Sequence, residues 1–85
     1  MLLKTGNQLR AARVLAGLTQ SELAKRCGIH TNSISAMEKR GAESLTSGLD
    51  TLNEVVRALE LLGIEFTNGD AIGVRMHPKL SRAKK

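Results

Sequence analysis

Apolar residues recur at intervals of three and four through most of this chain, and that spacing predicts amphipathic helices. The spacing is most regular over residues 49–62, where one side of a helix would collect Leu49, Leu52, Val55, Val56, Leu59 and Leu62. A shorter segment, Thr5 to Ala16, places Leu9, Ala12 and Leu15 on its predicted buried side. Glycine follows each segment, at positions 17 and 63, and glycine often ends a helix because it accepts a left-handed backbone.

Two shorter helical patterns lie between these segments and are separated by Gly28. The first covers about Gln20 to Arg26 and begins with a capping box, in which the side chains of Thr19 and Glu22 each bond the other residue's backbone amide. The second begins at His30 or Thr31 and ends near Lys39. Because Gly28 can take a left-handed conformation that a side chain disfavours, the chain can turn sharply there and resume a helix at once.

Small and apolar residues around Gly28 predict how these two helices pack. Ala24 would leave room for the helices to cross, Ile29 would fill the turn, and Ile34 and Met37 would anchor the second helix. This is the helix-turn-helix arrangement, which holds the exposed face of the second helix at a fixed angle to the first.

The pattern changes to short alternating runs after residue 63. We predict two strands, Ile64–Thr67 and about Asp70–Met76, joined at Asn68-Gly69, a dipeptide that favours a type I′ hairpin turn. The remaining residues, 77–85, contain a proline and no core-forming pattern, so a mobile tail is expected there. The predicted architecture is mainly α, with four helices followed by a short C-terminal β-hairpin.

The charge distribution points to a polyanionic partner. The net charge is +5, but residues 1–42 carry seven basic and two acidic side chains, residues 43–74 carry one and six, and the last eleven residues carry five and none. A basic front and an acidic middle favour a nucleic-acid-binding face with a separate back. The single cysteine, the lack of a signal-peptide pattern and the lack of an apolar run of about 20 residues favour a cytoplasmic protein that does not span a membrane.

Four fragments, Gln20-Ser-Glu-Leu-Ala24, Gly28-Ile29, Ile34-Ser35 and Glu38, together resemble the phage Cro/repressor-type helix-turn-helix family, also called the xenobiotic-response-element type. The resemblance covers about Leu9 to Leu62. It implies a four-helix, repressor-like helix-turn-helix domain over residues 1–63, followed by a β-hairpin dimerisation element over 64–76 and a basic mobile tail over 77–85. The alternative is an ordinary helical bundle that contains a tight turn.

The function implied by the resemblance is transcription regulation, as a repressor that binds double-stranded DNA. A homodimer would place helix 31–39 of each copy in the major groove of a palindromic operator. The resemblance implies base contacts by Thr31, Asn32 and Ala36, and Ser35 lies on the same predicted exposed face. The family's phosphate contact falls on Gln20, with Thr19 beside it, and Lys39 and Arg40 at the end of the third helix are expected to contact phosphate on the other side. Asn32 is the strongest candidate for base readout because asparagine can form two hydrogen bonds with adenine, whereas Ala36 can make only an apolar contact. For each of these residues the alternative is a solvated surface side chain.

Two further sets of residues are predicted to support binding indirectly. In the family an arginine of the first helix pairs with a glutamate late in the third, and the matching positions are Arg13 and Glu38, which implies a structural ion pair. The apolar hairpin residues are predicted to form the dimer interface through an exposed strand edge, and they are Ile64, Phe66, Ile72, Val74 and Met76. A chain cut after Leu62 would then remain a folded helical domain but become monomeric. The alternative is a monomer whose hairpin caps the helices.

No enzyme site, metal site or cofactor is predicted. The run Cys27-Gly-Ile-His30 does not provide four tetrahedral ligands, and no nucleophile lies near a base in a recognisable pattern. A second function of another class is an antitoxin-like or anti-activator protein. Such a protein would bind a protein partner through the acidic region Leu49–Val74 and use DNA binding for autoregulation. A large exposed apolar patch on helix 49–62 or on the hairpin would favour this second function.

Overall fold

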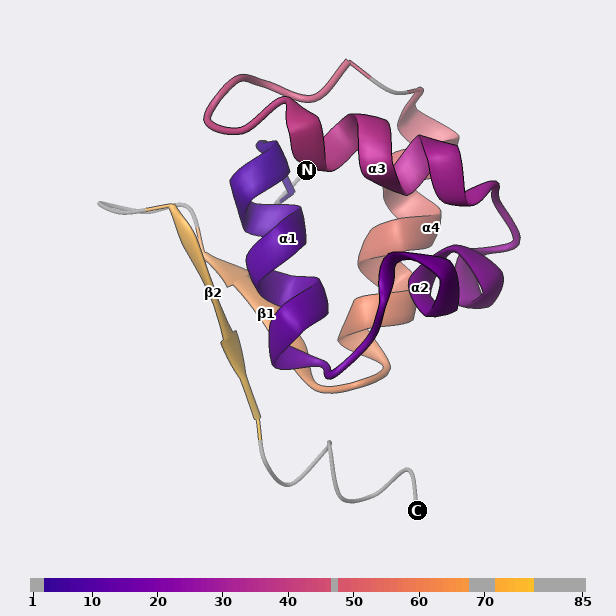
Figure 1. Cartoon of the computed structure of the whole chain (residues 1–85). Coiled ribbons are helices and arrows are strands. Elements are labelled where there is room, and N and C mark those ends of the chain that lie inside the picture. The colour runs from indigo at the N-terminus through magenta and orange to yellow at the C-terminus, as the bar shows by residue number, and fades with distance from the viewer. Residues whose placement is uncertain (1–2, 47, 68–71, 78–85) are drawn as a thin grey trace.

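The computed structural model describes residues 3–46, 48–67 and 72–77. Four helices, α1 (Gly6–Leu15), α2 (Gln20–Cys27), α3 (Thr31–Lys39) and α4 (Leu49–Glu60), precede two strands, β1 (Ile64–Thr67) and β2 (Gly73–Met76), as Figure 1 shows. The strands pair antiparallel. The predicted fold, mainly α with a C-terminal hairpin, is therefore confirmed. The predicted turn at Asn68-Gly69 and the tail beyond residue 77 lie outside the described residues.

Local hydrogen bonds set the ends of the helices. The predicted capping box of α2 is present, because the Thr19 hydroxyl accepts from the Glu22 amide at 3.1 Å and the Glu22 carboxylate accepts from the Thr19 amide at 2.8 Å. A second capping box, which the apolar periodicity does not reveal, begins α1 and pairs Thr5 with Gln8. Gly28 ends α2 with a φ of 70°, in the left-handed region where glycine is favoured.

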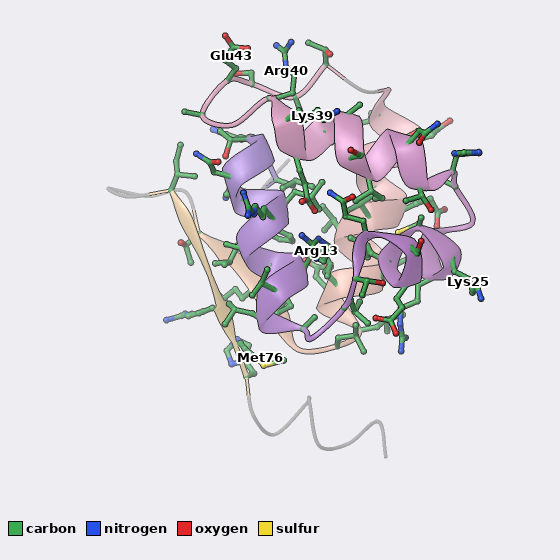
Figure 2. All side chains as sticks on the ribbon, viewed as in Figure 1. Arg13, Lys25, Lys39, Arg40, Glu43 and Met76 are labelled. Atoms are coloured by element: carbon green, nitrogen blue, oxygen red, sulfur yellow. The ribbon has the colours of Figure 1, made fainter. Side chains whose placement is uncertain are left out.

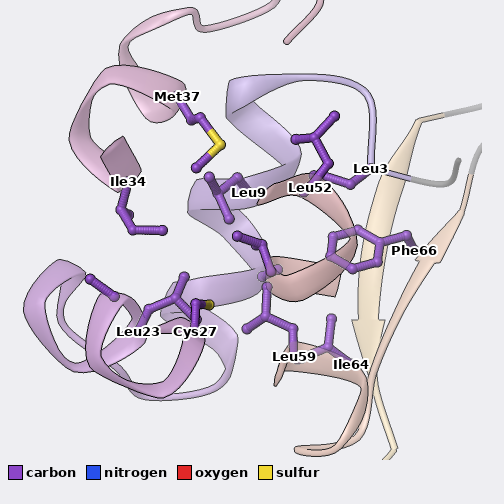
Figure 3. Packing of buried hydrophobic residues seen from close by; sticks show 13 residues of the cluster. Leu3, Leu9, Leu23, Cys27, Ile34, Met37, Leu52, Leu59, Ile64 and Phe66 are labelled. Carbon is purple, nitrogen blue, oxygen red and sulfur yellow. The ribbon is translucent and has the colours of Figure 1, made fainter. Parts of the chain in front are cut away.

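The core lies between the four helices and the inner face of the hairpin, as Figure 3 shows. Its fully buried large side chains come from α1, α2, α3, α4 and the segment before α1, and they are Leu3, Leu9, Leu23, Ile34, Leu59 and Val55. Two predicted core residues are exposed instead: Leu15 is 44% exposed and Leu49 is 63% exposed. Leu15 projects about 120° away from Leu9 around α1, and Leu49 is the first residue of α4, so neither reaches the core.

The hairpin belongs to the same core as the helices. The side chains of Ile64 and Phe66 are only 2% and 3% exposed, and Figure 3 shows both pointing toward the helices. The side-chain amide of Gln8, in α1, donates to one carbonyl oxygen from each strand of the hairpin. These are the oxygens of Thr67 in β1, at 3.4 Å, and of Gly73 in β2, at 3.3 Å. The core therefore continues across the domain boundary that was predicted at residue 63.

Helix α1 separates the hairpin from α3. It packs against β2 on one side and against α3 on the other, where Gly6 allows a close approach. A Cβ atom at Gly6 would overlap the Met37 carbonyl oxygen, so only glycine fits that position without a shift of the backbone. This arrangement leaves the opposite side of α3 exposed to solvent. Within the described ranges, no helix combines the length and the apolar content that crossing a membrane requires.

Candidate nucleic-acid interface

The four residues predicted to contact bases lie at solvent-accessible positions of α3. Asn32 and Ala36 are exposed, and Thr31 and Ser35 are half-exposed. The opposite side of the helix carries Ile34 and Met37, which are buried. Because burial fixes the rotation of α3 about its own axis, the side chains of Asn32 and Ala36 are directed outward.

The start of α3 is ordered by local contacts. The Nδ1 atom of His30 accepts a hydrogen bond from the Asn32 amide at 3.2 Å, so His30 caps the helix. The hydroxyl groups of Ser21 and Thr31 lie 3.4 Å apart and connect the first turn of α2 to the first turn of α3. Ala24 is buried where α2 and α3 pack together, and the Ile29 amide bonds its carbonyl oxygen at 3.0 Å. The predicted helix-turn-helix packing is therefore present.

An ion pair connects α1 to the last turn of α3. The Arg13 Nε atom donates to Glu38 Oε2 at 2.6 Å, and Nη2 donates to Oε1 at 3.1 Å. A third bond runs from Nη1 to the Leu18 carbonyl oxygen at 2.8 Å. The side chains are 15% and 6% exposed, so the carboxylate of Glu38 is almost entirely shielded from solvent. The hydrogen bond to Glu38 raises the pKa of the Arg13 guanidinium above its usual value, so the guanidinium remains charged at physiological pH.

Gln20, a predicted phosphate contact, is also part of this network. Its side-chain Nε2 atom donates to Glu38 Oε1 at 3.1 Å. Glu38 therefore joins α1, α2 and α3. The hydroxyl of Thr19, the neighbouring phosphate candidate, accepts from the Glu22 amide as the helix cap. The Glu22 amide is thus capped, and the two amides before it, of Gln20 and Ser21, lack an acceptor within the helix, which makes this end of α2 suited to an anion.

A shallow hollow lies where these three helices meet, beside the exposed face of α3. It is lined by Arg10, Arg13, Gln20, Ser35, Glu38 and Lys39. Three basic side chains and one acidic side chain give the lining a net charge of +2. Arg10 was not among the predicted contacts, because it comes near Lys39 only in the folded chain. The one sequence signal for it is its position one turn before Arg13 on α1.

The two basic residues at the end of α3 differ in their surroundings. Figure 2 shows Lys39 and Arg40 there, with Glu43 beyond them. The Nε atom of Arg40 donates to the Ser44 carbonyl oxygen at 3.0 Å, and its Nη2 atom lies 3.9 Å from a carboxylate oxygen of Glu43. Lys39 is exposed and lines the hollow described above. Of these two predicted phosphate contacts, Lys39 is better placed next to the face of α3.

The structure divides the predicted dimer residues into two groups. Ile64 and Phe66 are buried in the core of the chain itself, so a second copy could not reach them without unpacking that core. Ile72 is 55% exposed, and Val74 and Met76 are half-buried. The alternation of the sequence predicts which side of the strand these residues occupy, but it does not show what covers that side. Only the second group remains available to a partner.

The buried cysteine has no features of a reactive site. Cys27 is 8% exposed, and burial raises the pKa of its thiol to about 11. It is therefore protonated and unreactive at neutral pH. Within residues 3–46, 48–67 and 72–77, no three histidine, cysteine, aspartate or glutamate side chains gather in a way that could hold a metal ion.

The sequence profile of one family, described as helix-turn-helix, matches residues 9–67. The match includes most of α1, all of α2, α3 and α4, and β1. It therefore includes the hollow and the exposed face of α3. A search of curated proteins found none that matches the chain.

Proposed function

Because this chain belongs to the Cro/repressor-type helix-turn-helix family of DNA-binding regulators, we propose that it represses transcription from a specific operator. In this proposal the chain acts in the cytoplasm as a homodimer and reads a palindromic DNA site, with one α3 helix in the major groove at each half-site. The observation that carries the proposal is the exposed face of α3, which presents Asn32 beside the basic hollow formed by α1, α2 and α3.

The roles within this interface follow from the positions of the side chains. Asn32 and the neighbouring polar residues of α3 would contact base edges, because they project from the first turns of the helix. Arg10 and Lys39, which line the same hollow, would contact neighbouring phosphates along one side of the groove. The amides at the start of α2 would bind a third phosphate. Phosphate contacts would orient the protein on the DNA, and base contacts would select the sequence.

The second predicted function, binding of a protein partner through the acidic region, gains no support from α4. Its two exposed large apolar residues, Leu49 and Leu61, lie at opposite ends of the helix region. Polar side chains occupy the exposed positions between them, and these are Asp50, Asn53, Glu54, Arg57 and Glu60. Isolated exposed leucines are common on protein surfaces and do not indicate an interface.

Replacing Asn32 with alanine is expected to weaken operator binding by about 1–3 kcal/mol and to leave binding to random DNA nearly unchanged. The reason is that base contacts contribute to specific binding only. The operator is first obtained by selection from a random DNA library, and both affinities are then measured by fluorescence anisotropy. Asn53→Ala on the exposed side of α4 is the matched control and should change neither affinity. Equal losses on both DNAs would refute base readout by Asn32.

Replacing Lys39 with alanine is expected to weaken binding to every DNA sequence and to reduce the salt dependence. The slope of log K against log[salt] should become shallower by about 0.9 per chain, since one fewer counterion is released at each lost phosphate contact. Gln20→Ala should weaken binding without changing the slope, because glutamine is uncharged. Arg57→Ala on α4 should leave both quantities unchanged. A slope that Lys39→Ala does not alter would place this side chain away from the DNA backbone.

A further inference from the structure

The two ends of α3 are held in different ways. Its last turn is anchored by Glu38, which bonds both Arg13 of α1 and Gln20 of α2. Its first turn has no ion pair among the described residues and depends on the helix cap, in which the Nδ1 atom of His30 accepts from the Asn32 amide at 3.2 Å. The turn that carries Asn32 is therefore the part of the interface that a local chemical change can alter most easily.

This cap depends on the charge of the histidine ring. A neutral ring has one nitrogen that accepts a hydrogen bond, whereas a protonated ring carries a hydrogen on both nitrogens and accepts none. Protonation of His30 would therefore turn Nδ1 into a second donor that faces the Asn32 amide. It would also place a positive charge at the N-terminus of α3, where the helix dipole disfavours one. The caps formed by Thr5 and Thr19 differ, because their acceptors are hydroxyl oxygens that do not titrate at physiological pH.

The charged groups on the elements next to this cap balance one another. They are Lys25 and Arg26 in the last turn of α2 and Asp50 and Glu54 in the first half of α4. The first turn of α3 itself contains no acidic side chain, and α1 contacts α3 at its other end. Within the part of the chain that the structure describes, no charged group bonds the exposed ring of His30. The bond of the ring to α3 is therefore the contact that changes with its charge.

We propose that His30 makes operator recognition sensitive to acid. A neutral ring caps α3 and holds Asn32 in the position that reads bases, and a protonated ring releases this first turn. Histidine ordinarily changes its charge between about pH 5 and pH 8, so the change falls within the physiological range. The proposal rests on the function proposed above and adds a means of regulating it.

The other histidine of the chain responds to acid in the opposite way. The Nε2 atom of His77 lies 2.7 Å from a carboxylate oxygen of Glu65 on the hairpin, so protonation of this ring would add an ion pair. Hydrogen bonds from Arg75 and from His77 hold the pKa of the Glu65 carboxyl below its usual value, so this group stays ionised over the same pH range. Figure 1 places the hairpin on the far side of the molecule from the start of α3. His77 is therefore an internal control that lies outside the proposed DNA interface.

Binding to operator and to random DNA at two pH values tests the regulation. For the wild type, the ratio of the two affinities should fall about fivefold between about pH 8 and about pH 5.5, the factor that corresponds to the loss of a typical helix cap. Affinity for random DNA should be maintained or rise, because a positive ring adds attraction to phosphates. His30→Asn provides a cap that does not titrate and should give a constant ratio. His77→Gln is the matched control and should retain the wild-type fall.

Hydrogen exchange in the full-length free chain tests the cap without DNA. The protection factor of the Asn32 amide, measured by NMR and corrected for the intrinsic effect of pH on exchange, should fall about fivefold over the same range. The Glu22 amide is the matched control, because the Thr19 hydroxyl caps it at 3.1 Å and does not titrate, so its protection should stay constant. In the His30→Asn variant the Asn32 amide should also keep its protection.

The two measurements together separate the possible failures. Constant protection of the Asn32 amide in the wild type would overturn the proposal, because the ring would not control the cap. A fall in protection with a constant affinity ratio would also overturn it, because the first turn of α3 would not govern recognition. An equal fall of the ratio in His30→Asn would assign the pH effect to another group. Failure to bind any DNA, with the expected loss of protection, would refute the proposed function while supporting the response of the cap to acid.

Discussion

Replacing Arg13 with alanine is expected to lower the free energy of unfolding by about 3–5 kcal/mol, because it leaves the carboxylate of Glu38 shielded from solvent without its counter-charge. The side chain of Glu38 is only 6% exposed, and two of its hydrogen bonds come from Arg13. Urea denaturation followed by circular dichroism measures the effect. Arg10→Ala, at an exposed position of the same helix, is the matched control and should change the stability by no more than about 0.5 kcal/mol.

A double-variant cycle separates pairing from the loss of either side chain. If the two residues stabilise the fold as a pair, Arg13→Ala combined with Glu38→Ala should be less destabilising than the sum of the two single changes. DNA binding provides the opposing test. An Arg13→Ala chain that denatures at the wild-type urea concentration but no longer binds DNA would show that Arg13 acts as a DNA ligand, not as a partner of Glu38.

Ending the chain after Leu62 is expected to abolish cooperative folding, which reverses the outcome that the sequence alone predicts for this truncation. The cut removes Ile64 and Phe66, two buried side chains whose individual loss costs about 2–5 kcal/mol each. The total stability of a small domain is only about 5–15 kcal/mol. Thermal melting followed by circular dichroism distinguishes a sharp transition from a gradual loss of helix.

Single substitutions define the cause of this effect. Phe66→Ala should lower the free energy of unfolding by about 3–5 kcal/mol, whereas Leu61→Ala, at an exposed position, should have little effect. A chain ending at Leu62 that still melts cooperatively would mean that the helices form a complete core without the hairpin. In that case the hairpin would be an appendage, as its position after the helix-turn-helix first suggests.

Features that depend on neighbouring residues could be predicted from the sequence, and features that depend on distant ones mostly could not. The capping box of Thr19 and Glu22 and the turn at Gly28 involve residues within a few positions of each other, and both are present. Phe66 is buried in β1, which packs against α1, a helix far earlier in the chain, and the alternating pattern of the strand does not say whether a helix or a second copy covers it. The proximity of Arg10 to Lys39 is likewise a property of the folded chain.

Some features that the sequence did not predict depend on residues close together in the chain. Histidine is an uncommon helix cap, so the bond that His30 accepts from the Asn32 amide could not be expected from residue preferences. The box formed by Thr5 and Gln8 has the same spacing as the predicted one, but no interruption of the apolar pattern marks it. The ion pair of Arg13 and Glu38 was predicted across 25 residues, and the reason is that the family resemblance supplied the pairing.

The attachment of Glu38 to both Arg13 and Gln20 has a consequence for how the protein would be controlled. Turning α3 within one chain would break contacts with two other helices at the same time, and the loss of the ion pair alone costs about 3–5 kcal/mol, a large share of the stability of a small domain. We therefore expect α3 to keep one orientation in the folded chain, so that the extent of DNA binding depends on the concentration of the protein and not on a rotation of this helix. If the chain acts as the proposed homodimer, two copies associate before the full site is occupied, and operator occupancy at low abundance should rise with the square of the protein concentration. The rates of synthesis and degradation of the chain would then determine when the operator becomes occupied.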